Sequence, residues 1–247
     1  MIAQALHTIQ ASLPPQVQLV AVSKFHPVER LMEAYEAGQR VFAESRPQEL
    51  AAKVPQLPSD IQWHFIGHLQ TNKLKLVLPY VSLVQSVDSL HLLQAISAWG
   101  TANNTVVDVL LELHLGVEET KQGFSEEEIL AICEGIPSET VGCADPSLKG
   151  PSLIQGRGWP WVSQGIPSQH SNVRIRGLMG MATNTEDMAV VEKDFERIEG
   201  LYSKIKAIGL EGFDQLSIGM SQDWPIAVKH GATMVRIGTD IFGPREY

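Results

Sequence analysis

A lysine stands near the end of the first strongly apolar run of the chain, LVAVSKF at 19–25. In an extended strand Val20, Val22 and Lys24 share one face, so the lysine points to the same side as the valines. Desolvation by apolar surroundings lowers the pKa of a lysine, and the unprotonated amine is the form that attacks an aldehyde. Lys24 is therefore a candidate for covalent attachment of a carbonyl compound. A lysine that extends from a strand end to solvent would produce the same pattern.

Small and hydroxyl-bearing residues near the other end of the chain form a candidate anion site. Ser221 lies in the run GMSQD, and Arg236, Gly238 and Thr239 lie in the run MVRIGTDIFG. Hydroxyls, backbone N–H groups beside glycine and a helix N-terminus are the usual ligands of a phosphate. An ordinary strand end with a helix cap at Ser221 would give the same sequence pattern. Together, an aldehyde-reactive lysine and a phosphate site suggest a ligand with both groups, and pyridoxal 5′-phosphate has both.

The elements that must position these residues are read from periodicity. Short apolar, β-branched runs alternate with amphipathic helical stretches. The apolar runs, which we predict to be strands, lie at 19–25, 41–45, 63–67, 81–87, 106–113, 173–181, 213–220 and 234–242. Eight such strand–helix units in 247 residues predict a single α/β domain over 1–247, a (β/α)₈ TIM barrel. An open doubly wound sheet is the alternative, although no GxGxxG follows the first strand. A barrel would bring both candidate sites to the C-terminal ends of its strands, where such barrels bind ligands.

One segment interrupts the alternation. Residues 135–172 hold 6 Gly, 5 Pro and 6 Ser among 38 residues, a composition that does not propagate helix or strand. We therefore expect a long Gly/Pro/Ser-rich loop there. Loops of this length in compact domains are usually functional or disordered.

Composition narrows the classes of partner. With 19 Lys and Arg against 28 Asp and Glu, the net charge is −9, which argues against nucleic acid or an anionic membrane as partner. Two cysteines and the lack of a signal-like N-terminus favour a cytoplasmic protein. His64 and His68 are four residues apart but fall in a strand and the following loop, so no metal site is expected. The strand motifs carry no interface signal, and we expect a monomer.

Several of these runs resemble motifs of the pyridoxal phosphate homeostasis proteins, the YggS/PROSC family. The matching runs are AVSKFHP (21–27), VFAESRPQEL (41–50), WHFIGHLQTNK (63–73), SVDS (86–89), KQGF (121–124), RGLMGM (176–181) and LSIGMSQDWPIAVKHGATMVRIGTDIFG (216–243). They occur in the family's order and cover nearly the whole chain except about 135–172. The chain is thus identified from its motifs as a member of this family.

The resemblance implies a barrel like the N-terminal domain of alanine racemase and pyridoxal 5′-phosphate as cofactor. It implies that Lys24 holds the cofactor as a Schiff base, that Ser221, Gly238 and Thr239 bind its phosphate, and that Arg236 lies near the pyridine nitrogen. It further implies a role in intracellular cofactor homeostasis without evident turnover, with pyridoxal-phosphate-dependent apoenzymes as possible recipients.

The chain departs from the family pattern at two places. Family members commonly carry Gly-Glu-Asn after the second strand, whereas this chain reads Ala43-Glu44-Ser45. A serine cannot lay an amide against the cofactor ring, so no ring contact is carried over to Ser45. The second departure is the 135–172 segment, where relatives usually have one helix and short turns.

Two enzyme classes remain as alternatives to a cofactor carrier. A guanidinium beside the pyridine nitrogen disfavours its protonation and weakens the ring as an electron sink. The chain also ends four residues after Gly243, so we expect no second domain to supply an opposing acid or base. An amino-acid racemase or lyase with a base recruited from a loop stays open. So does an aldolase in which Lys24 forms a Schiff base with a sugar phosphate.

Overall fold

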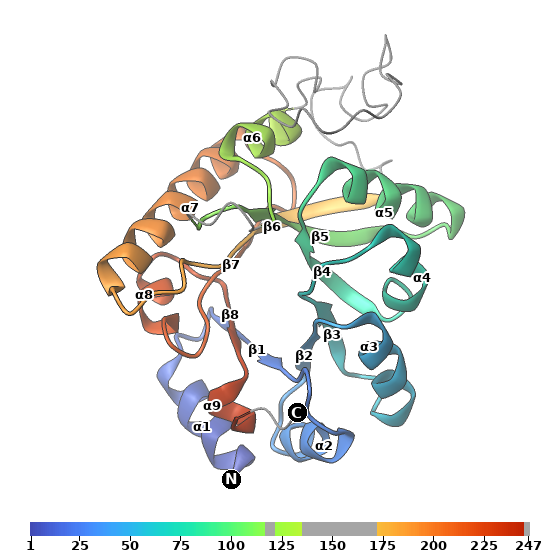
Figure 1. The fold of residues 1–247 in the computed structure, drawn as a ribbon, viewed down its shortest axis with the longest axis vertical. Helices are drawn as coiled ribbons and strands as arrows, with labels where there is room; N and C mark the ends of the chain where they lie inside the picture. The colour runs from blue at the N-terminus through green and yellow to red at the C-terminus, as the bar shows by residue number, and fades with distance from the viewer. Residues whose placement is uncertain (117–121, 135–171, 245–247) are drawn as a thin grey trace.

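Eight parallel strands close into a barrel in the computed structural model, which describes residues 1–116, 122–134 and 172–244. The strands follow one another around the ring in chain order, and β8 pairs with β1 to close it. Figure 1 shows the helices arranged around the outside of this ring. The TIM-barrel prediction is confirmed, and the open-sheet alternative is wrong because β1 has a neighbour on each side.

The strands are β1 (Gln18–Val22), β2 (Val41–Glu44), β3 (Gln62–Phe65), β4 (Val81–Val87), β5 (Val107–Leu113), β6 (Val173–Gly180), β7 (Gln215–Ser217) and β8 (Met234–Ile237). The helices are α1 (Ile2–Ser12), α2 (Val28–Glu36), α3 (Pro47–Lys53), α4 (Leu74–Val77), α5 (Leu90–Ala102), α6 (Glu126–Glu134), α7 (Met188–Ile208), α8 (Trp224–Lys229) and α9 (Thr239–Phe242). Short 3₁₀ helices cover Val54–Gln56 and Thr71–Lys73. Each strand is therefore followed by a helix, the repeat that defines this barrel.

The helix boundaries follow from capping chemistry in the sequence. At the start of α6 the Ser125 N–H donates to Glu128 Oε2 at 2.8 Å, and the Glu128 N–H donates to Ser125 Oγ at 3.2 Å. These reciprocal bonds form a capping box. The long α7 begins after Asp187, whose side chain accepts from the Ala189 N–H, and ends at Gly209 with a φ of 83°. Glycine adopts this left-handed conformation without steric cost.

The apolar core has two layers. The larger layer lies between the strands and the surrounding helices and contains Phe42, Phe65 and Phe195. The smaller layer fills the barrel interior and includes Val20, Val22, Val41, Ala43, Leu83, Leu110, Met179 and Met234. Side chains alternate between the layers along β1 and β2, as the period of two requires. Val20 and Val22 therefore point into the barrel.

Three strand ends differ from the sequence prediction. The first strand ends at Val22 and not at Phe25, because the chain turns and Phe25 takes a φ of 69°. The seventh covers only Gln215–Ser217, because Gly219 leaves the extended conformation with a φ of 91°. The eighth ends at Ile237, and Thr239–Phe242, predicted as strand, is the helix α9.

The predicted loop at 135–172 lies outside the described residues except for Asn172, and so does Cys143. Cys133 is described, on α6, where it is buried. Among the helices of the described part of the chain, none combines the length and apolar character needed to span a bilayer.

Candidate functional site

Lys24 lies two residues beyond the C-terminal end of β1, in a turn and not within the strand. It is half-buried, whereas Ser23 before it is fully buried. The turn is tight, because the N–H of His26 donates to the Ser23 carbonyl at 3.1 Å. Lys24 therefore stands at the rim of the barrel on the end that the sequence predicted.

The loop that carries Lys24 lies against the last helix of the barrel. The His26 ring stacks on the Phe242 ring with 5.0 Å between their centroids. Beneath this contact, β1 and β8 pair in parallel from Gln18–Met234 to Ala21–Ile237. Strand pairing and ring stacking thus hold Lys24 beside the start of α9.

Gly238 and Thr239 form the junction between β8 and α9. A Cβ at Gly238 would lie 3.1 Å from the Val22 carbonyl oxygen and 3.3 Å from Val22 Cβ. A Cβ at this distance would be tighter than most real Cβ contacts, so glycine favours the close approach of β8 to β1. The Thr239 side chain is exposed, and the first N–H groups of a helix have no acceptor within it.

Ser221 lies in the loop between β7 and α8, beside the same junction. The Arg236 N–H donates to the Gly219 carbonyl at 2.9 Å, which ties this loop to β8. Asp223 is buried and accepts from the Met220 N–H at 2.6 Å, so its carboxylate sets the shape of the loop. Within the described residues, no hydrogen bond engages the hydroxyls of Ser221 and Thr239. Two uncommitted hydroxyls therefore stand at the ends of two adjacent strands.

Arg236 points into the barrel and is buried. Its Nη1 donates to the Ser217 carbonyl at 2.7 Å and to Ser217 Oγ at 2.6 Å, and its Nη2 donates to the Gly180 carbonyl at 2.9 Å. Burial lowers the pKa of Arg236 to about 10, while Glu112 and Asp223 oppose that shift. The guanidinium therefore stays charged near neutral pH in a fixed orientation.

A chain of polar side chains runs from Arg236 across the barrel interior. Arginine can only donate, so Ser217 Oγ accepts from it and donates its own hydrogen bond to Gln85 Oε1 at 2.7 Å. The Gln85 amide nitrogen then donates to His64 Nδ1 at 2.8 Å. Burial lowers the pKa of His64 to about 4, consistent with a neutral acceptor ring. His64 is thus a hydrogen-bonded interior residue.

Three more titratable side chains lie at the ends of β3, β4 and β5. His68 Nδ1 lies 2.8 Å from Asp88 Oδ2, and the Asp88 side chain is only 6% exposed. Glu112 is buried, and this burial raises its pKa to about 7, with Asp88 adding to the rise and Arg236 opposing it. No group of three or more His, Cys, Asp or Glu suited to a metal ion occurs among the described residues.

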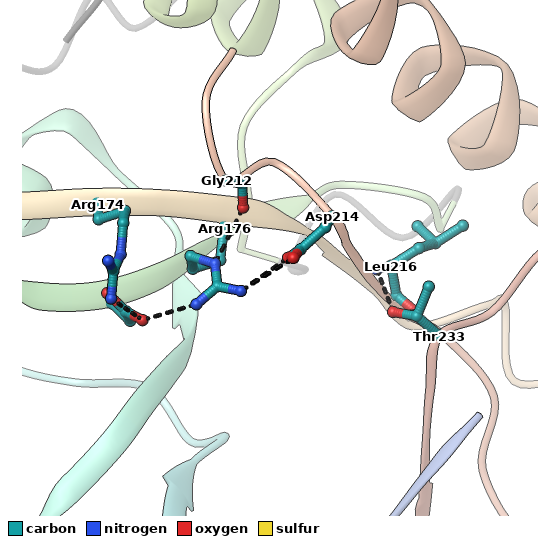
Figure 2. Close-up of polar contacts among 7 residues, drawn as sticks. Arg174, Arg176, Gly212, Asp214, Leu216 and Thr233 are labelled. Carbon is teal, nitrogen blue, oxygen red and sulfur yellow. Dashed lines mark hydrogen bonds and ion pairs between the residues drawn. The ribbon is translucent and has the colours of Figure 1, made fainter. Parts of the chain in front are cut away.

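A surface ion network lies at the opposite end of the barrel. Arg176 donates to Asp214 Oδ1 at 2.9 Å, to Asp108 Oδ2 at 3.0 Å and to the Gly212 carbonyl at 2.9 Å (Figure 2). Arg174 forms a two-bond contact with the same Asp108. Both arginines of this network are paired with carboxylates, which leaves it poorly suited to bind an anion.

The structure brings the five predicted site residues to three neighbouring strand ends. Lys24 follows β1, Ser221 follows β7, Arg236 lies in β8, and Gly238 and Thr239 follow it. The sequence prediction missed Glu112. A charged residue inside the apolar run VVDVLLEL was the available signal, because an ionised side chain is rarely buried without a reason.

The chain is similar in sequence to a family model and to known proteins. The sequence model described as "Alanine racemase, N-terminal domain" matches residues 1–142. The pyridoxal phosphate homeostasis protein of Haemophilus influenzae is 32% identical over 235 residues, which cover 94% of this chain and 86% of the relative.

Solved structures agree with this placement. PipY of Synechococcus elongatus without PLP superposes with a TM-score of 0.80 at 33% identity, covering 98% of this chain and all of PipY. PipY with PLP bound superposes with a TM-score of 0.77. Alanine racemase of Clostridium difficile has a TM-score of 0.71 at 13% identity and is matched over 57% of its length, which shows the shared fold alone. The chain belongs to the family of pyridoxal phosphate homeostasis proteins, built on the barrel of the alanine racemase N-terminal domain.

Proposed function

We propose that this protein binds pyridoxal 5′-phosphate through Lys24 and takes part in the homeostasis of that cofactor. The observation that carries the proposal is the convergence of an amine, two hydroxyls and a buried guanidinium at the ends of β1, β7 and β8. The binding of PLP by PipY, a relative of the same length and fold, supports it.

The donor set suits both ends of the cofactor. Ser221 and Thr239 offer hydroxyls to the phosphate, and Gly238 lets β8 pack closely against Val22 of β1. Arg236 donates three hydrogen bonds to protein oxygens, so its orientation is set before any ligand binds. An arginine beside the ring nitrogen would keep that nitrogen unprotonated, because two positive charges would otherwise meet.

Lys24 would anchor the cofactor covalently. When bound, pyridoxal phosphate supplies an aldehyde carbon to which an unprotonated amine adds, and the aldehyde oxygen leaves as water with both amine protons. The turn after β1 presents Lys24 at the rim, and the stacking of His26 on Phe242 fixes that turn beside the proposed phosphate site.

In the form of the proposal that we favour, the protein is a monomeric carrier in the cytoplasm that passes its cofactor to apoenzymes.

Glu112 supports a second candidate function, an amino-acid racemase or lyase. Its buried carboxyl, with a pKa near 7, lies within electrostatic reach of Arg236 and could exchange a proton. Loss of the α-proton of amino acids in deuterated water, catalysed by the loaded protein and abolished in Glu112→Gln, would favour this candidate.

The test of the main proposal is an absorption spectrum of the purified protein before and after borohydride, followed by peptide mapping. We expect a visible band that borohydride removes, and a pyridoxyl group on Lys24. The Lys24→Ala variant should lose both while its circular dichroism is unchanged. A colourless protein that cannot be loaded would contradict the proposal, and labelling of Lys24 by a sugar phosphate instead would support an aldolase.

A further inference from the structure

A buried ionic cluster, made of Glu44, Glu49 and Lys53, lies directly behind the loop that carries Lys24. Lys53 Nζ is 2.7 Å from Glu44 Oε1 and 2.7 Å from Glu49 Oε1. The Lys53 side chain is 7% exposed and that of Glu44 is fully buried. Lysine and glutamate are rarely buried to this degree unless they are paired.

The cluster binds the backbone on both sides of Lys24. Lys53 Nζ donates to the Ser23 carbonyl at 2.9 Å, and Ser23 Oγ donates to Glu44 Oε1 at 2.6 Å. On the other side of Lys24, the Phe25 N–H donates to Glu49 Oε1 at 2.7 Å. All three members of the cluster therefore contact a residue adjacent to Lys24.

The backbone held in this way is strained. Phe25 has a φ of 69°, a left-handed conformation that is unfavourable for an aromatic residue. Strain of this kind persists only where the surrounding contacts over-determine the backbone. A charge-assisted hydrogen bond from the Phe25 N–H to a carboxylate is such a contact, and the Arg46 guanidinium lies 4.3 Å from the centre of the Phe25 ring.

The cluster is costly as a purely structural device. Glu44 Oε2 is buried and has no hydrogen-bond partner among the described residues, and burial raises the pKa of Glu44 although Lys53 opposes the rise. A buried ion pair of this kind is often no more stabilising than apolar residues of the same volume. Its retention beside a strained turn therefore calls for an explanation other than stability.

We propose that Glu44, Glu49 and Lys53 are positioning residues that hold the strained Ser23–Phe25 turn so that Lys24 presents its amine to the cofactor aldehyde. The inference rests on the proposed function of Lys24 and adds three residues to it. A small displacement of a reacting group lowers the rate of a covalent step steeply, by about a hundredfold for 1 Å.

The variants distinguish the hydrogen bond that the Phe25 N–H donates to Glu49 from the charges of the cluster. Glu49→Ala removes the acceptor of the Phe25 N–H, whereas Glu49→Gln keeps an oxygen that can accept the same bond. Lys53→Met keeps the aliphatic stem and removes the ammonium. Since Lys53→Met leaves Glu44 without its partner, the double variant Glu44→Gln with Lys53→Met removes both charges of that pair, in case the single variant fails to fold.

The matched control lies at the opposite end of the barrel. Arg176→Met removes the residue that joins Asp108 and Asp214 in the surface ion network (Figure 2). All variants are compared under conditions in which circular dichroism shows them to be folded. A loss caused by lower stability alone would appear in the control as well.

Two measurements on each protein test the inference. The first is the rate of pyridoxal phosphate attachment to Lys24, trapped by borohydride and mapped by mass spectrometry. The second needs no cofactor: competitive acetylation of Lys24 in the unloaded protein across pH, together with amide hydrogen exchange of the peptide that contains Phe25. We expect Glu49→Ala and the double variant to slow attachment at least about tenfold, to change the acetylation profile and to speed exchange at Phe25. Glu49→Gln should recover most of the rate, and Arg176→Met should match wild type.

The possible failures are distinguishable. If wild type itself does not attach the cofactor at Lys24, the proposed function is wrong. If wild type does so and Glu49→Ala and the double variant match it in rate and acetylation profile, the positioning role is wrong. Equal losses in Arg176→Met and the cluster variants would also overturn it, because stability would then be the cause.

Discussion

Gly238 lies so close to Val22 that a single added carbon would come within 3.1 Å of the Val22 carbonyl oxygen. This approach joins the last strand to the first at the level where Lys24 and Thr239 stand. The close packing of β8 on β1 therefore sets the spacing between the proposed covalent anchor and the proposed phosphate ligands.

Substitution of Gly238 by alanine tests this spacing. Because the new Cβ meets backbone as well as a side chain, we expect Gly238→Ala to lower the free energy of unfolding by about 1–3 kcal/mol and to weaken cofactor binding. Gly200 is the matched control, since nothing lies within 4 Å of its added Cβ in the middle of α7. Gly200→Ala should raise stability by about 0.5–1 kcal/mol, the helix preference for alanine. Urea unfolding and an absorbance titration measure both effects, and wild-type behaviour of Gly238→Ala would refute the spacing argument.

The hydroxyls of Ser221 and Thr239 should matter only for the phosphate. We expect Ser221→Ala with Thr239→Val to weaken pyridoxal phosphate binding by about 1–3 kcal/mol per lost charge-assisted bond. Binding of pyridoxal, which lacks the phosphate, should be unchanged in the same variant. Equilibrium dialysis with both ligands measures this difference, and Ser203→Ala on the exposed side of α7 serves as control. An equal loss for both ligands would place the phosphate elsewhere.

Glu112 should make stability fall as pH rises. Its folded pKa, about 7, lies above the ordinary value of 4.5, so the fold favours the protonated carboxyl. The resulting stability is fully present below pH 4.5 and is lost as pH rises through about 7, by roughly 3 kcal/mol in total. In Glu112→Gln this dependence should vanish. Urea unfolding at a series of pH values measures the difference between the two proteins, and parallel curves would contradict the assignment.

His64 should remain neutral with its proton on Nε2. The hydrogen-bond directions from Arg236 through Ser217 and Gln85 make Nδ1 the acceptor, and burial lowers the pKa of the ring to about 4. Long-range ¹H–¹⁵N spectra of the histidines report both the tautomer and the titration. Gln85→Leu should shift the Nδ1 resonance by removing its donor. A ring protonated on Nδ1, or one that titrates near the ordinary 6.5, would show that this chain of bonds is absent.

The sequence predicted the barrel because its strands and helices repeat with clear periods. It placed Lys24, Ser221 and Thr239 at the correct end, since a parallel barrel gathers all strand ends there. It extended the eighth strand through Thr239–Phe242 because a short apolar run has the same composition in a strand and in a helix turn. Gly238 was the signal that a boundary lay within that run.

The partners of buried polar residues could not be predicted. Glu49 and Lys53 are four apart, a spacing that also suits an exposed ion pair on a helix. Only the packing of α3 against the turn after β1 shows that they bind the backbone beside Lys24. His64 similarly gave no sign of its link through Gln85 on β4 to Ser217 on β7.

The stacking of His26 on Phe242, together with the pairing of β1 with β8, has a consequence for the order of assembly. Lys24 is synthesised before its neighbours on β8 and α9, so a nascent chain carries the proposed anchor before the rest of the proposed site exists. Contacts this distant along the chain also form slowly in refolding. A ligand that bridges the two strands would bind only the closed ring and so draw the folding equilibrium toward it. Supply of the cofactor would thereby raise the yield of completed barrels.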